Sequence, residues 1–213
     1  MIKISASVLS ADLSNLEREV RRVSAAGADM LHIDVMDGVF VPPMTFGDVV
    51  VKSLRDKSDV TFDTHLMVSK PTVRLIENFA RAGSNFITVH AECGSDVREI
   101  LEFIKSLGCK AGVAVNPKTP IEEVFQFTEQ ADMFTIMSVK PGYGGQPFIP
   151  ASLDKIRALR AWTGALIQVD GGINENTAPK VIEAGADILV AGAYLMNSAD
   201  MSGAINSLRL FVR

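Results

Sequence analysis

Four side chains in this sequence are of the kinds that bind transition metals. His32 and Asp34 lie two positions apart in HIDVMDG, His65 lies in THLMV, and Asp170 comes before two glycines in QVDGG. Imidazole nitrogens and carboxylate oxygens together could hold one divalent ion such as Zn²⁺, Fe²⁺, Mn²⁺ or Co²⁺. A single buried histidine more often satisfies a backbone group, but a His-x-Asp pair with two further residues at matching strand ends favours a metal site.

The stretch HIDVMDG lies inside an apolar segment that predicts a buried β-strand. Side chains alternate along a strand, so His32, Asp34 and Met36 are expected on one face, with Ile33 and Val35 on the other. An unpaired charge is costly to bury, so this row of polar side chains needs a partner. A metal ion shared with the other two residues would supply one.

Eight short apolar runs are predicted as strands, and amphipathic helical patterns separate most of them. The runs cover residues 2–9, 30–36, 60–68, 86–92, 110–116, 133–139, 165–172 and 188–193. The segments AAGADMLHI, RAGSNFITV, EQADMFTI and EAGADILVA repeat one pattern of helix end, tight turn and strand. This pattern predicts an α/β fold, a (β/α)₈ TIM barrel that forms a single domain over residues 1–213. An open doubly wound sheet fits less well, because no GxGxxG follows the first strand.

The carboxyl ends of barrel strands carry the functional residues, so other side chains at these ends are candidates as well. Met36, Met67 and Met137 each fall near a strand end and predict a collar that excludes water from the metal. Asp63 shares a strand face with His65 and is expected to orient that ligand through a hydrogen bond. His90, in TVHAE, is expected to be a supporting or core residue.

Glycine-rich segments follow the last three predicted strands. They are SVKPGYGGQPF at residues 138–148, DGGIN after the seventh strand and AGA after the eighth. Loop amides and a short helix N-terminus at this place in a barrel often bind phosphate, so the three segments together favour a phosphate site.

The composition excludes several other classes of protein. The net charge is −4 and the basic residues are scattered, so no nucleic-acid or anionic-membrane surface is expected. The two cysteines, Cys93 and Cys109, match no disulfide framework or zinc motif and are expected in the core. The sequence shows no apolar leader and no run of about 20 apolar residues, so a cytoplasmic protein is expected.

Over essentially its full length the chain resembles the ribulose-phosphate 3-epimerase family. The matching stretches are SVLSADL, HIDVMDGVFVP, THLMVSKP, MSVKPGYGGQPF, VDGGI and GADILVAG. The resemblance implies a barrel of the ribulose-phosphate-binding type and inversion at C3 of a ketose phosphate, in the first place D-ribulose 5-phosphate to D-xylulose 5-phosphate. It implies one divalent metal ion, zinc first, with no organic cofactor, and a homo-oligomer.

The resemblance also implies roles for individual residues. The metal ligands would be His32, Asp34, His65 and Asp170, and two of these, Asp34 and Asp170, would transfer the C3 proton through an enediolate that the metal stabilises. The substrate would contact Ser7, Met36, His65, Met67, Met137, Gly142, Gly144, Gly145, Gly171, Gly172, Gly192 and Ala193.

Two departures from the family pattern bear on the substrate. Ala193 stands where the family usually has serine or threonine, and Lys140 stands where it more often has Asn, Glu or Asp. Lys140 would either add positive charge near the phosphate or be a solvated loop residue. A hexulose phosphate such as D-allulose 6-phosphate is therefore an alternative substrate. A related barrel decarboxylase or aldolase-type synthase would need an Asp-x-Lys-x-x-Asp motif, which HIDVMDG lacks, and a non-catalytic phosphate-binding barrel would lack one of the four ligands.

Overall fold

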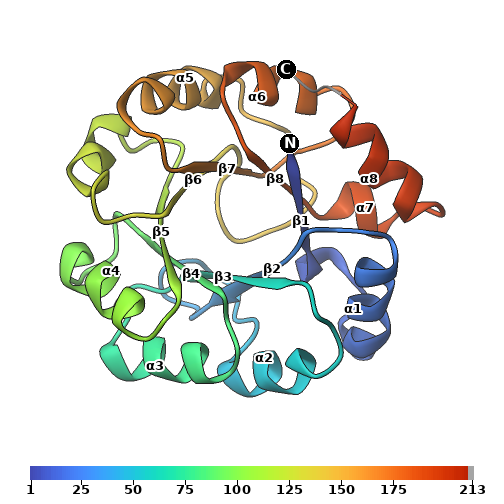
Figure 1. The fold of residues 1–213 in the computed structure, drawn as a ribbon, viewed down its shortest axis with the longest axis horizontal. Helices are drawn as coiled ribbons and strands as arrows, with labels where there is room; N and C mark the ends of the chain where they lie inside the picture. The colour runs from blue at the N-terminus through green and yellow to red at the C-terminus, as the bar shows by residue number, and fades with distance from the viewer. Residues whose placement is uncertain (211–213) are drawn as a thin grey trace.

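Eight parallel strands close a barrel in sequence order, from β1 to β8 and back to β1 (Figure 1). The computed structural model describes residues 1–210. The strands are β1 Lys3–Ser7, β2 Met30–Met36, β3 Thr61–Met67, β4 Phe86–His90, β5 Lys110–Val115, β6 Met133–Met137, β7 Leu166–Asp170 and β8 Ile188–Ala191. The predicted TIM barrel is confirmed, and all eight predicted strands are present.

Helices surround the ring of strands (Figure 1). The α-helices are α1 Leu16–Ala25, α2 Asp48–Arg55, α3 Val73–Arg81, α4 Val97–Ser106, α5 Ser152–Trp162, α6 Ala178–Ala184, α7 Ala193–Met196 and α8 Met201–Arg209. Three 3₁₀-helices are η1 Val8–Ser10, η2 Leu13–Asn15 and η3 Ile121–Phe127. Among residues 1–210, none of the helices has the length and apolar composition needed to cross a bilayer.

Most predicted strands run too far at their carboxyl ends, and the first shows why. Residues 2–9 were expected as strand, but β1 ends at Ser7 and the chain turns into η1. The hydroxyl of Ser7 accepts a hydrogen bond from the backbone N–H of Leu9 at 3.3 Å. Such local side-chain bonds compete with the hydrogen bonds between strands, so the strand ends at Ser7, which is itself a candidate functional residue.

The inside of the barrel is layered from apolar to polar. The first residues of four alternate strands, Met30, Phe86, Met133 and Ile188, form an apolar cluster that closes the amino end.

Between the barrel and the helices lies the larger core, with fully buried rings such as Phe62. Cys93 and Cys109 are free and buried, as expected.

A hydrogen-bonded polar layer lies inside the barrel around Asp63, which is fully buried. The Asp63 carboxylate accepts from the Ser5 hydroxyl at 3.1 Å and from the Gln168 side-chain amide at 2.6 Å, and the Thr135 hydroxyl donates to the Gln168 side-chain oxygen at 2.8 Å. Strands β1, β3, β6 and β7 are thereby joined through the barrel interior. We call these four residues, Ser5, Asp63, Thr135 and Gln168, the polar layer, and it supports the side chains at the carboxyl end of the barrel.

Candidate active site

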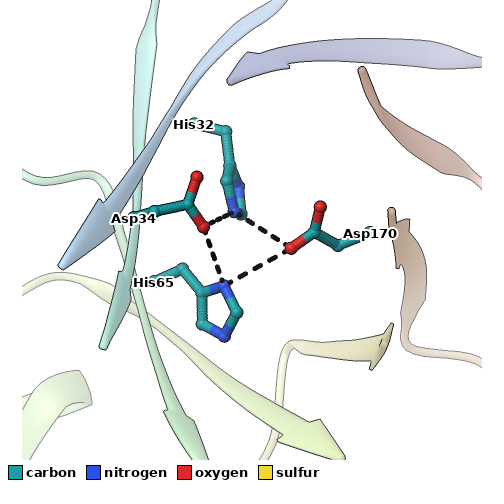
Figure 2. A group of neighbouring side chains, drawn as sticks. All are labelled: His32, Asp34, His65 and Asp170. Carbon is teal, nitrogen blue, oxygen red and sulfur yellow. Dashed lines mark ion pairs between the residues drawn. The ribbon is translucent and has the colours of Figure 1, made fainter. Parts of the chain in front are cut away.

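The four predicted metal ligands meet at the carboxyl end of the barrel (Figure 2). The His32 Nε2 lies 3.3 Å from Asp34 Oδ1 and 3.7 Å from Asp170 Oδ2. The His65 Nδ1 lies 3.5 Å from the same Asp34 oxygen and 3.7 Å from the same Asp170 oxygen. One atom from each residue thus lies within 4.8 Å of the other three, and we call these four residues the ligand cluster.

The ligand cluster fits a divalent transition metal. His32 Nε2 and His65 Nδ1 are buried, and neither has a hydrogen-bond partner among residues 1–210. Buried polar atoms are normally paired, so two unpaired nitrogens that face carboxylates fit a site for a cation. Ligands about 2.0–2.2 Å from a tetrahedral ion lie about 3.3–3.6 Å apart, close to the four distances measured here. The cluster could therefore hold one metal ion with little rearrangement.

His32 is oriented by Asp63, a residue of the polar layer. Its Nδ1 lies 2.7 Å from Asp63 Oδ2, so the ring donates to that carboxylate and leaves Nε2 free for a metal. The expectation that Asp63 orients His65 is therefore wrong. The register of β2 on β3 pairs His32 with Asp63, whereas His65 is paired with Asp34.

His65 is oriented through a second histidine. Its Nε2 lies 2.9 Å from His90 Nε2, and His90 Nδ1 lies 3.1 Å from Glu92 Oε2. Burial and the nearby His65 lower the pKa of His90 to about 4, so its ring is neutral at physiological pH. His65 therefore donates to His90, and His90 donates to the carboxylate of Glu92, which leaves His65 Nδ1 free for a metal. The expectation that His90 supports the site is confirmed.

Glu92 ends this series of hydrogen bonds, and the sequence analysis did not predict its role. Its other oxygen, Oε1, accepts from the backbone N–H of Asn116 at 2.8 Å. Burial works to raise the pKa of Glu92, but hydrogen bonds from His90, Thr119 and Asn116 outweigh it and lower that pKa to about 2. The carboxylate is therefore a permanent acceptor. The His-x-Glu spacing in TVHAE, which mirrors the His-x-Asp of β2, is the signal that could have revealed it.

The two carboxylates of the ligand cluster have different environments. Burial works to raise the pKa of Asp34, but His32 and His65 lower it, and the Ser7 hydroxyl donates to Asp34 Oδ2 at 2.7 Å. Burial raises the pKa of Asp170 to about 7, and the negative charges of Asp34 and Asp63 add to that rise. Asp34 is held ionised, and Asp170 is poised to gain or lose a proton near neutral pH.

A cavity of about 370 Å³ opens at this end of the barrel and reaches the two carboxylates. Met36, Met67 and Met137 line it, and each is at most 4% exposed. Their apolar side chains share the cavity with the two carboxylates. The predicted collar of methionines therefore has the required position.

The remaining predicted residues line the same cavity. They are Ser7, Gly142, Gly144, Gly145, Gly171, Gly172, Gly192 and Ala193. We call the six glycines, which follow β6, β7 and β8, the glycine wall. Within residues 1–210, no hydrogen bond uses the backbone N–H of Gly144, Gly145, Gly172 or Gly192, so these donors are available to a ligand. Lys140 is exposed and does not line the cavity.

Comparisons with known proteins agree with this geometry. The model of the ribulose-phosphate 3 epimerase family matches residues 3–196. The chain is 43% identical to the ribulose-phosphate 3-epimerase of Bacillus subtilis (strain 168) over 98% of this chain and 99% of that protein. It is 41% identical to the enzyme of the same name from Escherichia coli (strain K12) over 97% of this chain and 94% of that protein.

Two solved structures with the same fold are more distant in sequence. The crystal structure of a 3-hexulose-6-phosphate synthase superposes with a TM-score of 0.75 at 17% identity, over 100% of both chains. The crystal structure of KGPDC from Streptococcus mutans superposes with a TM-score of 0.74 at 13% identity, over 98% of this chain and 96% of that one. Such likeness shows the fold alone, whereas the family model and the close relatives show that this chain belongs to the ribulose-phosphate 3-epimerase family.

Proposed function

We propose that this protein inverts C3 of a ketose phosphate and interconverts D-ribulose 5-phosphate and D-xylulose 5-phosphate. The observation that carries the proposal is the ligand cluster, in which two carboxylates that line the cavity face a pair of unpaired imidazole nitrogens. Membership in the family supports the choice of reaction.

Asp34 and Asp170 are the proposed acid and base. They come from β2 and β7 and approach the two imidazoles from separate sides (Figure 2). Inversion needs one group to remove the C3 proton from one face of the substrate and another to return a proton on the other face. Acid–base assistance of this kind contributes about 10²–10⁴-fold per step. The Ser7 hydroxyl holds Asp34 in place, so the position of its free oxygen is fixed.

The ligand cluster is the proposed site of one divalent metal ion, zinc in the first place. The ion would supply Lewis-acid stabilisation of the negative charge that develops on the substrate when C3 loses its proton. His32 and His65 would each present one ring nitrogen to it, and the rings are held by Asp63 and by His90. No organic cofactor enters this proposal.

The glycine wall is the proposed site of the phosphate group. No lysine or arginine is among the cavity-lining residues of the described chain, so the anion would be held by neutral donors. This also argues against a decarboxylase or synthase that relies on a lysine in the cavity. We further propose that the protein is a cytoplasmic homo-oligomer.

Proton exchange at C3 tests the proposal. The metal-loaded protein is incubated in D₂O with D-ribulose 5-phosphate, and deuterium at C3 is followed by NMR beside D-xylulose 5-phosphate formation. We expect product with deuterium at C3, and loss of both after chelation of the metal. If neither product nor exchange is observed, the pentulose phosphate is ruled out as the substrate. The same experiment with D-allulose 6-phosphate would then test the hexulose alternative.

A further inference from the structure

Ser10 is a cavity residue to which the reaction gives no role. It is the last residue of η1, three positions after Ser7, and it lines the same cavity. The Ser7 hydroxyl has no proton left to donate to a ligand, because it donates to Asp34, and it also accepts from Leu9. The Ser10 hydroxyl makes no hydrogen bond with any residue of the described chain.

Few other side chains of the cavity have a free polar group. The side chains of Gln146, Asn174 and Tyr194 all form hydrogen bonds within the protein. Tyr143 and Asn197 have no bonded polar side-chain atom within residues 1–210, but both are exposed. Ser10 is half-buried, so water competes less strongly for its hydroxyl than for theirs. A half-buried donor without a partner beside a cavity is available to a ligand.

The position of Ser10 identifies which part of the cavity it serves. A Cβ atom built on Gly192 would lie 3.0 Å from the Ser10 Oγ, and one built on Gly144 would lie 2.6 Å from it. The Ser10 hydroxyl therefore lies against two segments of the glycine wall, one after β6 and one after β8. Both positions are glycine, and that leaves room for this hydroxyl. The neighbouring Ala193 offers only a methyl group.

We propose that Ser10 donates its hydroxyl to the phosphate group of the substrate and helps to select phosphorylated sugars. This inference rests on the proposed function, which places the phosphate at the glycine wall. Because the described cavity has no cationic side chain, the anion depends on backbone N–H groups and on each added neutral donor. Ser10 would then be a binding residue, separate in role from Ser7 in the same turn.

The test compares Ser10→Ala with Ser14→Ala in the metal-loaded full chain. Ser14 is in the next turn, and its hydroxyl bonds Asp12 on the surface. For each variant we would measure KM and kcat with D-ribulose 5-phosphate, and the affinity for inorganic phosphate by titration calorimetry. Loss of one hydrogen bond to a charged group predicts that Ser10→Ala raises both KM and the phosphate Kd about 10- to 100-fold. We expect kcat within about threefold of the parent, and no change for Ser14→Ala.

Each outcome has a definite meaning. A phosphate Kd within about twofold of the parent for Ser10→Ala overturns the inference, and so does a fall in kcat with KM unchanged. Phosphate titration does not depend on turnover. If the parent protein failed to epimerise D-ribulose 5-phosphate, the proposed function would fail, while the role of Ser10 would still be decided by the phosphate Kd.

Discussion

The ligand cluster and the glycine wall line one cavity but are built in opposite ways. In the ligand cluster the side chains are ionisable. Three of them are buried and held by a second residue: Asp34 by Ser7, His32 by Asp63, and His65 by His90. The glycine wall has no side chains, and its free donors are backbone N–H groups, with the hydroxyl of Ser10 lying against it.

This difference separates chemistry from binding. Proton transfer needs groups whose pKa values differ. In the ligand cluster the two imidazoles lower the pKa of Asp34, whereas burial, with the charges of Asp34 and Asp63, raises the pKa of Asp170. A phosphate needs only an array of donors, and neutral donors do not disturb those pKa values. Changes in the ligand cluster should therefore lower kcat or metal affinity, and changes in the glycine wall should raise KM.

The largest effect is expected for Asp170→Asn. The amide cannot accept the C3 proton, so kcat should fall about 10³–10⁴-fold while KM changes little. Steady-state kinetics with the metal content confirmed would measure this. Asp154→Asn is the matched control, because Asp154 is on α5 with its side chain 85% exposed. A KM rise with kcat preserved would contradict a role of Asp170 in chemistry.

Metal affinity should rise as the pH is raised through 7. The pKa of Asp170 is raised to about 7 and that of His32 is raised by Asp34 and Asp63, which outweigh the effect of burial. Below pH 7 both groups hold protons that the metal must displace, so affinity should fall about tenfold or more per pH unit. Asp34, whose pKa is lowered, adds nothing in this range. Competition between the protein and a chelator for the metal, measured from pH 5 to 8, would show this dependence. A metal affinity that does not change with pH would contradict it.

Glu92→Gln should weaken metal binding by about 10- to 100-fold. Glu92 accepts hydrogen bonds with both oxygens, so the new NH₂ group must face an N–H donor of either His90 or Asn116. The bond that fixes His90, and through it His65, is then lost or strained. Glu102→Gln, on the exposed side of α4, should leave the metal Kd unchanged. Equal metal affinity in the two variants would show that His65 needs no such support.

The smallest effect is expected for Gly172→Ala in the glycine wall. Gly172 has a φ of +65°, and a Cβ there would lie 2.7 Å from the backbone of Phe148. The substitution should raise KM about tenfold with kcat within about threefold, at a stability cost of about 1–2 kcal/mol for the left-handed backbone. Gly164→Ala is the control, since its Cβ would meet no atom within 4 Å. A fall in kcat larger than the rise in KM would contradict the division between the two regions.

The sequence predicted the barrel and the ligand cluster because both depend on local patterns. Alternation along β2 brings His32 and Asp34 to one face, and the order of strands brings His65 and Asp170 to the same end. The partner of Asp63 was predicted wrongly, because alternation fixes a face but not the register between neighbouring strands.

Other contacts were missed for related reasons. Glu92 lies just beyond the end of β4, where strand periodicity no longer applies. Ser10 lies in a 3₁₀ turn whose first two residues, Val8 and Leu9, were predicted as strand. Their roles follow from the approach of separate loops, which no pattern within one segment encodes.

The measurement that tests the central claim most directly is deuterium exchange at C3 by metal-loaded Asp34→Asn and Asp170→Asn, starting from each epimer. If the two carboxylates serve opposite faces, each variant should lose epimerisation but still exchange the C3 proton of one epimer, and the two variants should retain exchange with different epimers. Loss of exchange from the same epimer in both variants, or exchange from both epimers in either one, would contradict a division of proton transfer between Asp34 and Asp170.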